Sequence, residues 1–494
     1  MSEQVFHPGR LVMVDIQGKT LDATTAAFLR DNQIRAVCLF RKNLGTEAEV
    51  RQLTKDLREA MGPDALIGLD QEGGSVVRAT FLPQPPSAMA LGAAGDEALA
   101  EQVGAAVARG LRGIGINWNF APVTDINNNP ANPVIAERSF GETADTVTRL
   151  AGAWMKGSMD AGVACCIKHF PGHGDTHVDS HLDLPTVEKT RAELDALELK
   201  PFKALRDAAP SIMTAHIVYP KIDPQYPATL SKTILGGILR DEYGYDGVVI
   251  TDALMMKAIA ERYGYAKAAV LAINAGADMI LAQGSLDEQA QAILALQDAL
   301  SRGGLSVERG RQAEARLDKL ARDFPVRFDD YAGARREQDD VLMRRAWAAG
   351  LSALRGATPP SADRAIRVLV QDEVPTDGVS EAGPTGAQVR ALFEGYRDVE
   401  FVSLTDIAAL DWATVPADGR FTIVASTHRA RYGEHAAAWR PDLHLVLWNP
   451  FQALDVSGPT VISWGYADGA LAALGAWLQG RGQAGGQSPV TLAA

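Results

Sequence analysis

A fourteen-residue stretch of the sequence gathers the side chains best suited to acid–base chemistry. Residues 168–181 read KHFPGHGDTHVDSH and contain four of the nine histidines of the chain, together with two aspartates. Histidine changes its charge near neutral pH, and a hydrogen bond to one ring nitrogen fixes the tautomer of the other. The stretch is therefore the first candidate for a catalytic site.

This stretch is predicted to leave the end of a buried strand. It follows the apolar run 163–167, and its Pro171, Gly172 and Gly174 oppose a regular helix. We therefore expect its polar side chains on a loop at the C-terminal end of that strand.

The histidines of this stretch stand four residues apart, at positions 169, 173, 177 and 181. On a helix they would line one face and suggest a zinc site. The proline and glycines oppose that helix, and no acidic or cysteine ligand stands at a recognised zinc spacing. We therefore predict that this stretch binds no metal. The remaining alternative to a catalytic loop is a solvated polar loop.

Two further carboxylates, those of Asp70 and Asp252, stand at the ends of predicted strands. Asp70 precedes Gly73 and Gly74, which let the backbone turn tightly or approach a ligand closely. Asp252 ends the apolar run 247–252 and is followed by more apolar residues. Each aspartate could cap a helix or act as a positioned functional group, and both interpretations stay open at this point.

A long polar loop is predicted after the fourth apolar run, over residues 119–141. Loops of this length in a compact domain are usually functional or disordered. Its Arg138 could form an ion pair with a nearby acid such as Asp125.

The elements that must position these residues alternate between short apolar runs and longer helical patterns through the first 290 residues. Strands that alternate with helices form a parallel sheet, and about eight such units fit a (β/α)8 barrel. An open doubly wound sheet is the alternative, but polar residues at the ends of many runs favour the barrel. The expected strands are 11–16, 36–40, 65–70, 116–122, 163–169, 211–216, 247–252 and 278–282.

A second, smaller α/β domain is predicted after the barrel. We place the barrel at 1–335, a linker helix and a break at 336–358, and the second domain at 359–494. A parallel sheet is expected in the second domain, and no catalytic motif is found there. Its expected strands are 365–371, 399–404, 422–426, 443–448 and 460–463.

Composition excludes several classes of protein. The 494 residues are 47% hydrophobic and 22% charged, which is typical of a globular protein. A net charge of −13 argues against general affinity for nucleic acid or anionic membranes. Cys38, Cys165 and Cys166 lie in apolar runs, which suits a reducing compartment. With no signal-like start and no apolar run of about 18 residues, we expect a cytoplasmic location.

The string KHFPGHGDTHVDSHLDLP at 168–185 closely resembles the signature loop of glycoside hydrolase family 3 β-N-acetylglucosaminidases. Further strings that resemble this family follow its order over roughly the first two thirds of the chain. They are DQEGGSVVR at 70–78, NPVIAERSFG at 132–141 and GVVITDALMM at 247–256. One departure is Ser75, where many relatives carry arginine, and it makes Arg78 the better candidate.

The resemblance implies a role for each matching residue. Asp252 would be the nucleophile, and Asp179 with His181 would form a dyad in which His181 is the general acid/base. The implied sugar-binding residues are Asp70, Arg78, Arg138, Lys168 and His169.

The resemblance implies a retaining exo-β-N-acetylglucosaminidase that acts on a sugar or muropeptide substrate, such as cell-wall peptidoglycan fragments, through a covalent intermediate at Asp252. No metal or organic cofactor is required. The first alternative is a phosphorylase that uses the same residues. The second is a non-catalytic sugar-binding protein, which would not need both Asp252 and His181.

Overall fold

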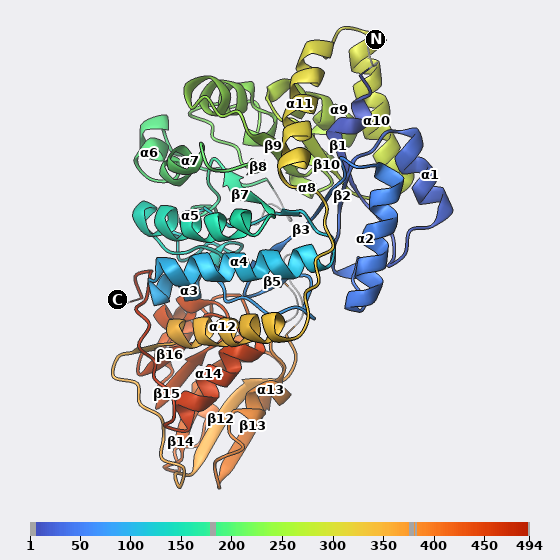
Figure 1. Cartoon of the computed structure of the whole chain (residues 1–494). Helices are drawn as coiled ribbons and strands as arrows, with labels where there is room; N and C mark the ends of the chain where they lie inside the picture. The colour runs from blue at the N-terminus through green and yellow to red at the C-terminus, as the bar shows by residue number, and fades with distance from the viewer. Residues whose placement is uncertain (1–5, 178–183, 375–379, 381–382, 493–494) are drawn as a thin grey trace.

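The computed structural model describes residues 6–177, 184–374, 380 and 383–492 (Figure 1). Eight parallel strands close into a barrel in the order β1-β10-β9-β8-β7-β6-β3-β2. The open-sheet alternative is wrong, because β1 pairs with both β2 and β10. Each expected run overlaps one strand, and β7 and β9 each end one residue beyond the expected run. The strands are β1 Val12–Asp15, β2 Ala36–Cys38, β3 Leu66–Leu69, β6 Trp118–Asn119, β7 Ala164–Phe170, β8 Ser211–Thr214, β9 Val248–Ala253 and β10 Met279–Ala282.

Helices surround the barrel and bury one apolar face against it. In α2 the buried Val50, Leu53 and Leu57 recur at helical spacing. A capping box between Thr46 and Glu49 starts this helix. The surrounding helices are α1 Ala23–Asp31, α2 Glu47–Met61, α4 Glu97–Gly113, α5 Ala144–Asp160, α6 Arg191–Ala196, α7 Leu199–Leu205, η5 Thr233–Glu242, α8 Lys257–Tyr263, α9 Tyr265–Ala275, α10 Leu286–Ser301 and α11 Val307–Asp323.

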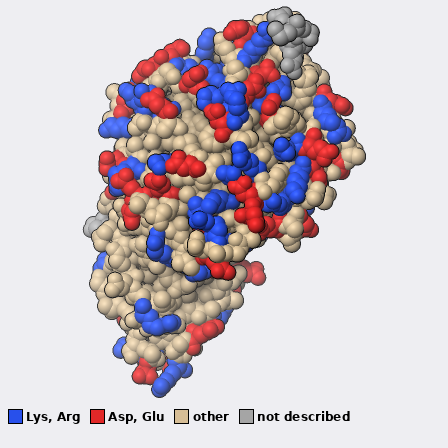
Figure 2. All heavy atoms as spheres, viewed as in Figure 1, with Lys and Arg blue, Asp and Glu red and all other residues tan. Residues whose placement is uncertain are grey.

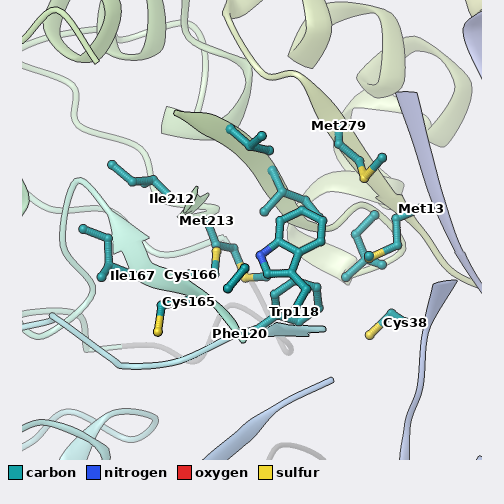
Figure 3. Packing of buried hydrophobic residues seen from close by; sticks show 14 of the residues in the cluster. Met13, Cys38, Trp118, Phe120, Cys165, Cys166, Ile167, Ile212, Met213 and Met279 are labelled. Carbon is teal, nitrogen blue, oxygen red and sulfur yellow. The ribbon is translucent and has the colours of Figure 1, made fainter. Parts of the chain in front are cut away.

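The interior of the barrel is filled by large side chains (Figure 3). Trp118 and Phe120 lie near its centre, with their rings 5.2 Å apart in an edge-to-face arrangement. The indole of Trp118 donates a hydrogen bond to Ser211 Oγ at 2.8 Å, so its buried N–H is satisfied. Gly68 leaves the space that Phe120 fills, since a Cβ there would lie 2.9 Å from the Phe120 ring. The barrel is a packed core, so a ligand must bind at one of its ends.

The second domain contains a six-stranded sheet in the order β11-β16-β15-β14-β12-β13. Five of its strands are parallel as expected, but β11 runs antiparallel to β16, which makes the sheet mixed. We keep 1–335, 336–358 and 359–494 as a proposed division, noting that β11 falls within the linker. The elements are β11 Ser352–Leu354, β12 Ile366–Gln371, α13 Gly386–Ala391, β13 Val399–Leu404, β14 Phe421–Ser426, β15 Leu443–Val446, β16 Thr460–Ile462 and α14 Asp468–Leu478.

Helices α12, Ala334–Gly350, and α3, Ala88–Ala94, lie where the barrel meets the second domain (Figure 1). Trp347 of α12 is buried in a cluster that also contains residues of both α3 and α14. Gly465 and Gly469 accommodate its ring, because a Cβ at either position would lie within 2.5 Å of it. Ser87 donates across the junction to the Trp464 carbonyl at 2.7 Å. The two domains therefore share one packed apolar interface.

The outer surface carries both signs of charge. On the face drawn in Figure 2, basic and acidic side chains are interspersed over the barrel. Among the helices that the structure describes, none is both long and apolar enough to cross a membrane. All three cysteines are buried free thiols.

Helices α4 and α5 approach each other closely through glycine. A Cβ on Gly104 of α4 would lie 2.0 Å from the Trp154 carbonyl oxygen, and one on Gly157 of α5 would lie 1.9 Å from the Glu101 carbonyl oxygen. These glycines allow the two helix backbones to touch. Any side chain at either position must push the helices apart.

We expect Gly104→Ala to lower the free energy of unfolding by about 1–3 kcal/mol, because overpacking outweighs the better helix propensity of alanine. Gly237→Ala in η5 is the control, since an added Cβ there meets nothing within 4 Å. It should be neutral or stabilise by up to about 1 kcal/mol. Urea unfolding of both variants measures the difference, and equal stabilities would contradict this packing.

Candidate active site

A cavity of about 460 Å³ lies at the C-terminal ends of the barrel strands. Phe120, Met213 and Leu281 give it apolar lining above the barrel core. All six predicted site residues within the described ranges line it: Asp70, Arg78, Arg138, Lys168, His169 and Asp252. Asp179 and His181 lie outside the described residues. The barrel thus brings together side chains that are up to 182 residues apart in sequence (252 − 70).

A buried ion network forms one wall of the cavity. Arg138 donates to both oxygens of Glu72, from Nε and from Nη2, each at 2.9 Å. Lys168 Nζ lies 2.7 Å from Glu72 Oε1 and 2.7 Å from Asp70 Oδ1. Burial opposes the charge of Glu72, but Arg138 and Lys168 outweigh it and hold the pKa of this carboxyl well below its usual range.

The same network settles two alternatives left open by the sequence. Arg138 does form an ion pair with a nearby acid, and that acid is Glu72, not Asp125. Asp70 precedes the strand β4, Gln71–Gly73, which pairs with β5, Val76–Val77, so it does not cap a helix. Its second oxygen lies 3.6 Å from Arg78 Nη2. Burial opposes the charge of Lys168, yet Asp70 and Glu72 raise the pKa of its ammonium group.

Asp125 holds the first part of the histidine-rich stretch. Its Oδ1 accepts the backbone N–H groups of His169 at 3.0 Å and His173 at 2.7 Å. Its Oδ2 lies 2.7 Å from His169 Nδ1. Burial opposes the charge of Asp125, but His169 and these hydrogen bonds lower the pKa of its carboxyl. Because the carboxylate accepts from Nδ1–H, a neutral His169 carries an acceptor nitrogen at Nε2.

The remaining described histidines of the stretch have different partners. His173 Nδ1 lies 2.9 Å from Thr176 Oγ1, and burial together with nearby His169 lowers the pKa of His173 to about 4. His177 Nδ1 lies 3.3 Å from Asn129 Nδ2. Among the residues that the structure describes, no group of three or more His, Cys, Asp or Glu side chains is arranged to hold a metal ion.

Asp252 is the second-to-last residue of strand β9, and it lines the cavity. Its Oδ1 accepts the N–H of Ala253 at 2.8 Å. Helix α8 begins only after Met256, and no side chain caps it, so Asp252 is not a helix cap. His216 Nε2 lies 3.0 Å from the Ala253 carbonyl and ties the end of β9 to its neighbouring strand. The carboxylate is therefore positioned by the sheet itself.

Several cavity residues were not singled out from the sequence. Glu72 stands within the 70–78 string, and its position between Asp70 and two glycines was an available signal. Asp15 is the last residue of β1, a position like that of Asp70 just after β3. Its carboxylate pairs with Lys42 at 2.6 Å. Ser380 comes from the second domain, and no local pattern marks it.

A filled (β/α)8 barrel with carboxylates and cations around a small terminal cavity is the architecture of a barrel enzyme for a compact polar ligand. The model of the glycosyl hydrolase family 3 N-terminal domain matches residues 7–320, and the chain belongs to that family.

Curated relatives and solved structures agree with this assignment. Beta-hexosaminidase A of Pseudoalteromonas piscicida is 37% identical over 335 residues, which are 62% of this chain and 56% of that protein. A beta-hexosaminidase of Pseudomonas aeruginosa is 34% identical over 70% of this chain and 98% of its own. The structure of a family 3 β-N-acetylglucosaminidase from Paenibacillus is 33% identical, with a TM-score of 0.88 over 98% of both chains. The chain thus spans just over half of the length of the Pseudoalteromonas piscicida protein.

We expect Glu72→Gln to lower the free energy of unfolding at neutral pH by about 3–5 kcal/mol, because it leaves two buried cations short of a partner. The pKa of Glu72 is below its ordinary value of 4.5, so its stabilisation is complete above that pH. It is lost as the pH falls toward the lowered value. Wild type and variant should therefore begin to converge in stability below about pH 4, and the gap should keep narrowing as the pH falls further.

Urea unfolding across the acid range measures this convergence. The control is Glu59→Gln, which removes an exposed carboxylate of α2 and should track wild type throughout. A constant gap between wild type and Glu72→Gln down to acid pH would contradict the charge network.

Proposed function

We propose that the protein is a retaining exo-β-N-acetylglucosaminidase that releases terminal N-acetylglucosamine from β-glycosides. The observation that carries the proposal is that Asp252 shares one small cavity with the network of Asp70, Glu72, Arg138 and Lys168. The names of the relatives, beta-hexosaminidase and β-N-acetylglucosaminidase, support the choice of sugar.

The ion network supplies what is needed to orient a sugar ring. Carboxylates accept hydroxyl hydrogen bonds, whereas guanidinium and ammonium groups donate them. Asp70, Arg78, Arg138 and Lys168 bind the hydroxyls in this proposal, and His169 accepts another through Nε2. Since the charged groups already restrain one another, they are pre-organised before the sugar arrives.

The oriented sugar presents its anomeric carbon to Asp252. A carboxylate nucleophile on one face of that carbon and a proton donor near the leaving oxygen are the two groups that a retaining glycosidase uses. Asp252 forms the covalent glycosyl-enzyme, and water releases the sugar in a second step. Phe120 and Met213 close the cavity below, which suits the removal of one terminal unit.

The acid/base role goes to His181, with Asp179 as its partner. These two residues lie outside the described ranges, and the resemblance of the 168–185 string supports their roles. In this proposal Asp179 would accept a hydrogen bond from one ring nitrogen of His181 and fix its tautomer, while the other nitrogen would serve the leaving group. With an ordinary pKa near 6.5, a histidine exchanges protons at neutral pH without further tuning.

The proposal extends to the natural substrate and the cellular location. Sugar-terminated fragments of cell-wall peptidoglycan, including muropeptides, are the proposed substrates. Three buried free thiols support a reducing compartment, and we propose the cytoplasm.

Water is the proposed acceptor in the second step. Phosphate would need cations that are not already neutralised, yet Lys168 contacts two carboxylates and Arg138 holds both oxygens of Glu72. Lys42 pairs with Asp15. Withdrawing the buried Lys168 or Arg138 from its partners would cost several kcal/mol.

We expect Asp252→Asn to lower kcat by about 10³-fold or more, because the amide is isosteric with the carboxylate but is not nucleophilic. The assay is hydrolysis of an aryl N-acetyl-β-glucosaminide. Asp246→Asn is the control, since its side chain is 86% exposed just before β9. Near wild-type turnover by Asp252→Asn would end this assignment and would favour a sugar-binding role for the site.

The choice of acceptor predicts that millimolar phosphate leaves both the rate and the product unchanged. Turnover of an N-acetylglucosaminide is followed with and without phosphate, and the released sugar is identified. We expect free N-acetylglucosamine in both reactions. Sugar 1-phosphate, formed at a rate that rises with phosphate, would instead identify a phosphorylase with the same nucleophile.

A further inference from the structure

Ser380 brings a hydroxyl group from the second domain to the cavity of the barrel. It follows β12 in the chain, is only 3% exposed, and lines the same cavity as Asp70 and Asp252. Among the second-domain residues that the structure describes, no other lines this cavity. Apolar side chains of Val76, Val134 and Ile135 are also part of the lining.

A chain of hydrogen bonds fixes this hydroxyl. Arg429, which follows β14, donates from Nη1 to Ser380 Oγ at 2.6 Å. Ser380 Oγ donates in turn to Ser75 Oγ at 3.2 Å, and Ser75 Oγ donates to Glu137 Oε1 at 2.5 Å. A charged donor strengthens the hydrogen bonds that the hydroxyl makes as a donor. All four side chains are buried.

Arg429 also holds the loop that carries Arg138. Its Nη2 donates to the Val134 carbonyl, and Arg138 Nη1 donates to the same oxygen at 3.0 Å. Trp448 of the second domain donates from Nε1 to Glu137 Oε1 at 2.9 Å. The second domain therefore holds the segment 134–138 in place, and with it Arg138.

We propose that Ser380 is a sugar-contacting residue supplied by the second domain, and that Arg429 is the positioning residue for both Ser380 and Arg138. The inference rests on the proposed function, since it takes the ligand to be the terminal sugar of a glycoside. The neutral hydroxyl of Ser380 forms a hydrogen bond with one hydroxyl or amide group of that sugar. The second domain is thereby part of the specificity of the enzyme.

The test compares an aryl N-acetylglucosaminide with analogues that each lack one sugar hydroxyl, or the acetamido group. Ser380→Ala should lower kcat/KM for the parent about 3- to 10-fold, mostly through KM, because it removes one hydrogen bond to a neutral group. For the analogue that lacks the contacted group, Ser380→Ala should not lower kcat/KM further. Because each comparison is a ratio between two substrates of one variant, the amount of folded enzyme cancels.

Arg429→Met should lower kcat/KM for the parent about 10- to 100-fold, since it releases both Ser380 and the loop of Arg138. Adding Ser380→Ala to Arg429→Met should then have no further effect, because the two residues act as one unit. Ser361→Ala and Arg397→Met are matched controls at exposed second-domain positions and should behave as wild type.

An equal loss of kcat/KM on the parent and on every analogue would show that Ser380 only links the two domains structurally. That result would overturn the proposal. So would unchanged kinetics of Ser380→Ala on all substrates. Failure of the proposed function is a separate result: the wild type would cleave a glycoside of another sugar. The same series of analogues, made from that sugar, would then test Ser380.

Discussion

The carboxylate of Glu72, shared between Arg138 and Lys168, is the interaction on which the rest of the site depends. It is buried, so an unpaired charge at any of these three positions would cost several kcal/mol. Lys168 also contacts Asp70. The four groups are therefore restrained before any ligand binds, and the cavity has a fixed pattern of donors and acceptors.

The backbone around Glu72 explains why the network can form where it does. Gly73 has a φ of +123°, and a Cβ there would lie 2.1 Å from the Pro86 carbonyl oxygen. Glycine thus lets the β4–β5 hairpin approach the backbone of Pro85 and Pro86 closely. On the opposite side, the Val134 carbonyl accepts from both Arg138 and Arg429. The site is built between a glycine hairpin of the barrel and the second domain.

Much of the barrel was predictable because its strands are buried on both sides and appear as short apolar runs. Asp70, Lys168 and Asp252 were predictable as neighbours because parallel strands end at one edge. The pairing of Glu72 was not predictable, since it depends on the fold of a two-glycine hairpin. Ser380 contacts Ser75 across 305 residues, and no local pattern reports such a contact. Strand β11 was assigned to the linker, because three residues are too few to show a period.

The central claim is that Asp252 forms a covalent bond to the sugar. Its most direct test is to incubate the enzyme with a slowly hydrolysed fluorinated N-acetylglucosaminide, and to measure the intact mass and then the peptide masses after rapid acid quenching. The account predicts a mass increase of one sugar unit on the peptide that contains Asp252. Turnover of the fluorinated glycoside without any adduct, or an adduct on a different residue, would contradict it.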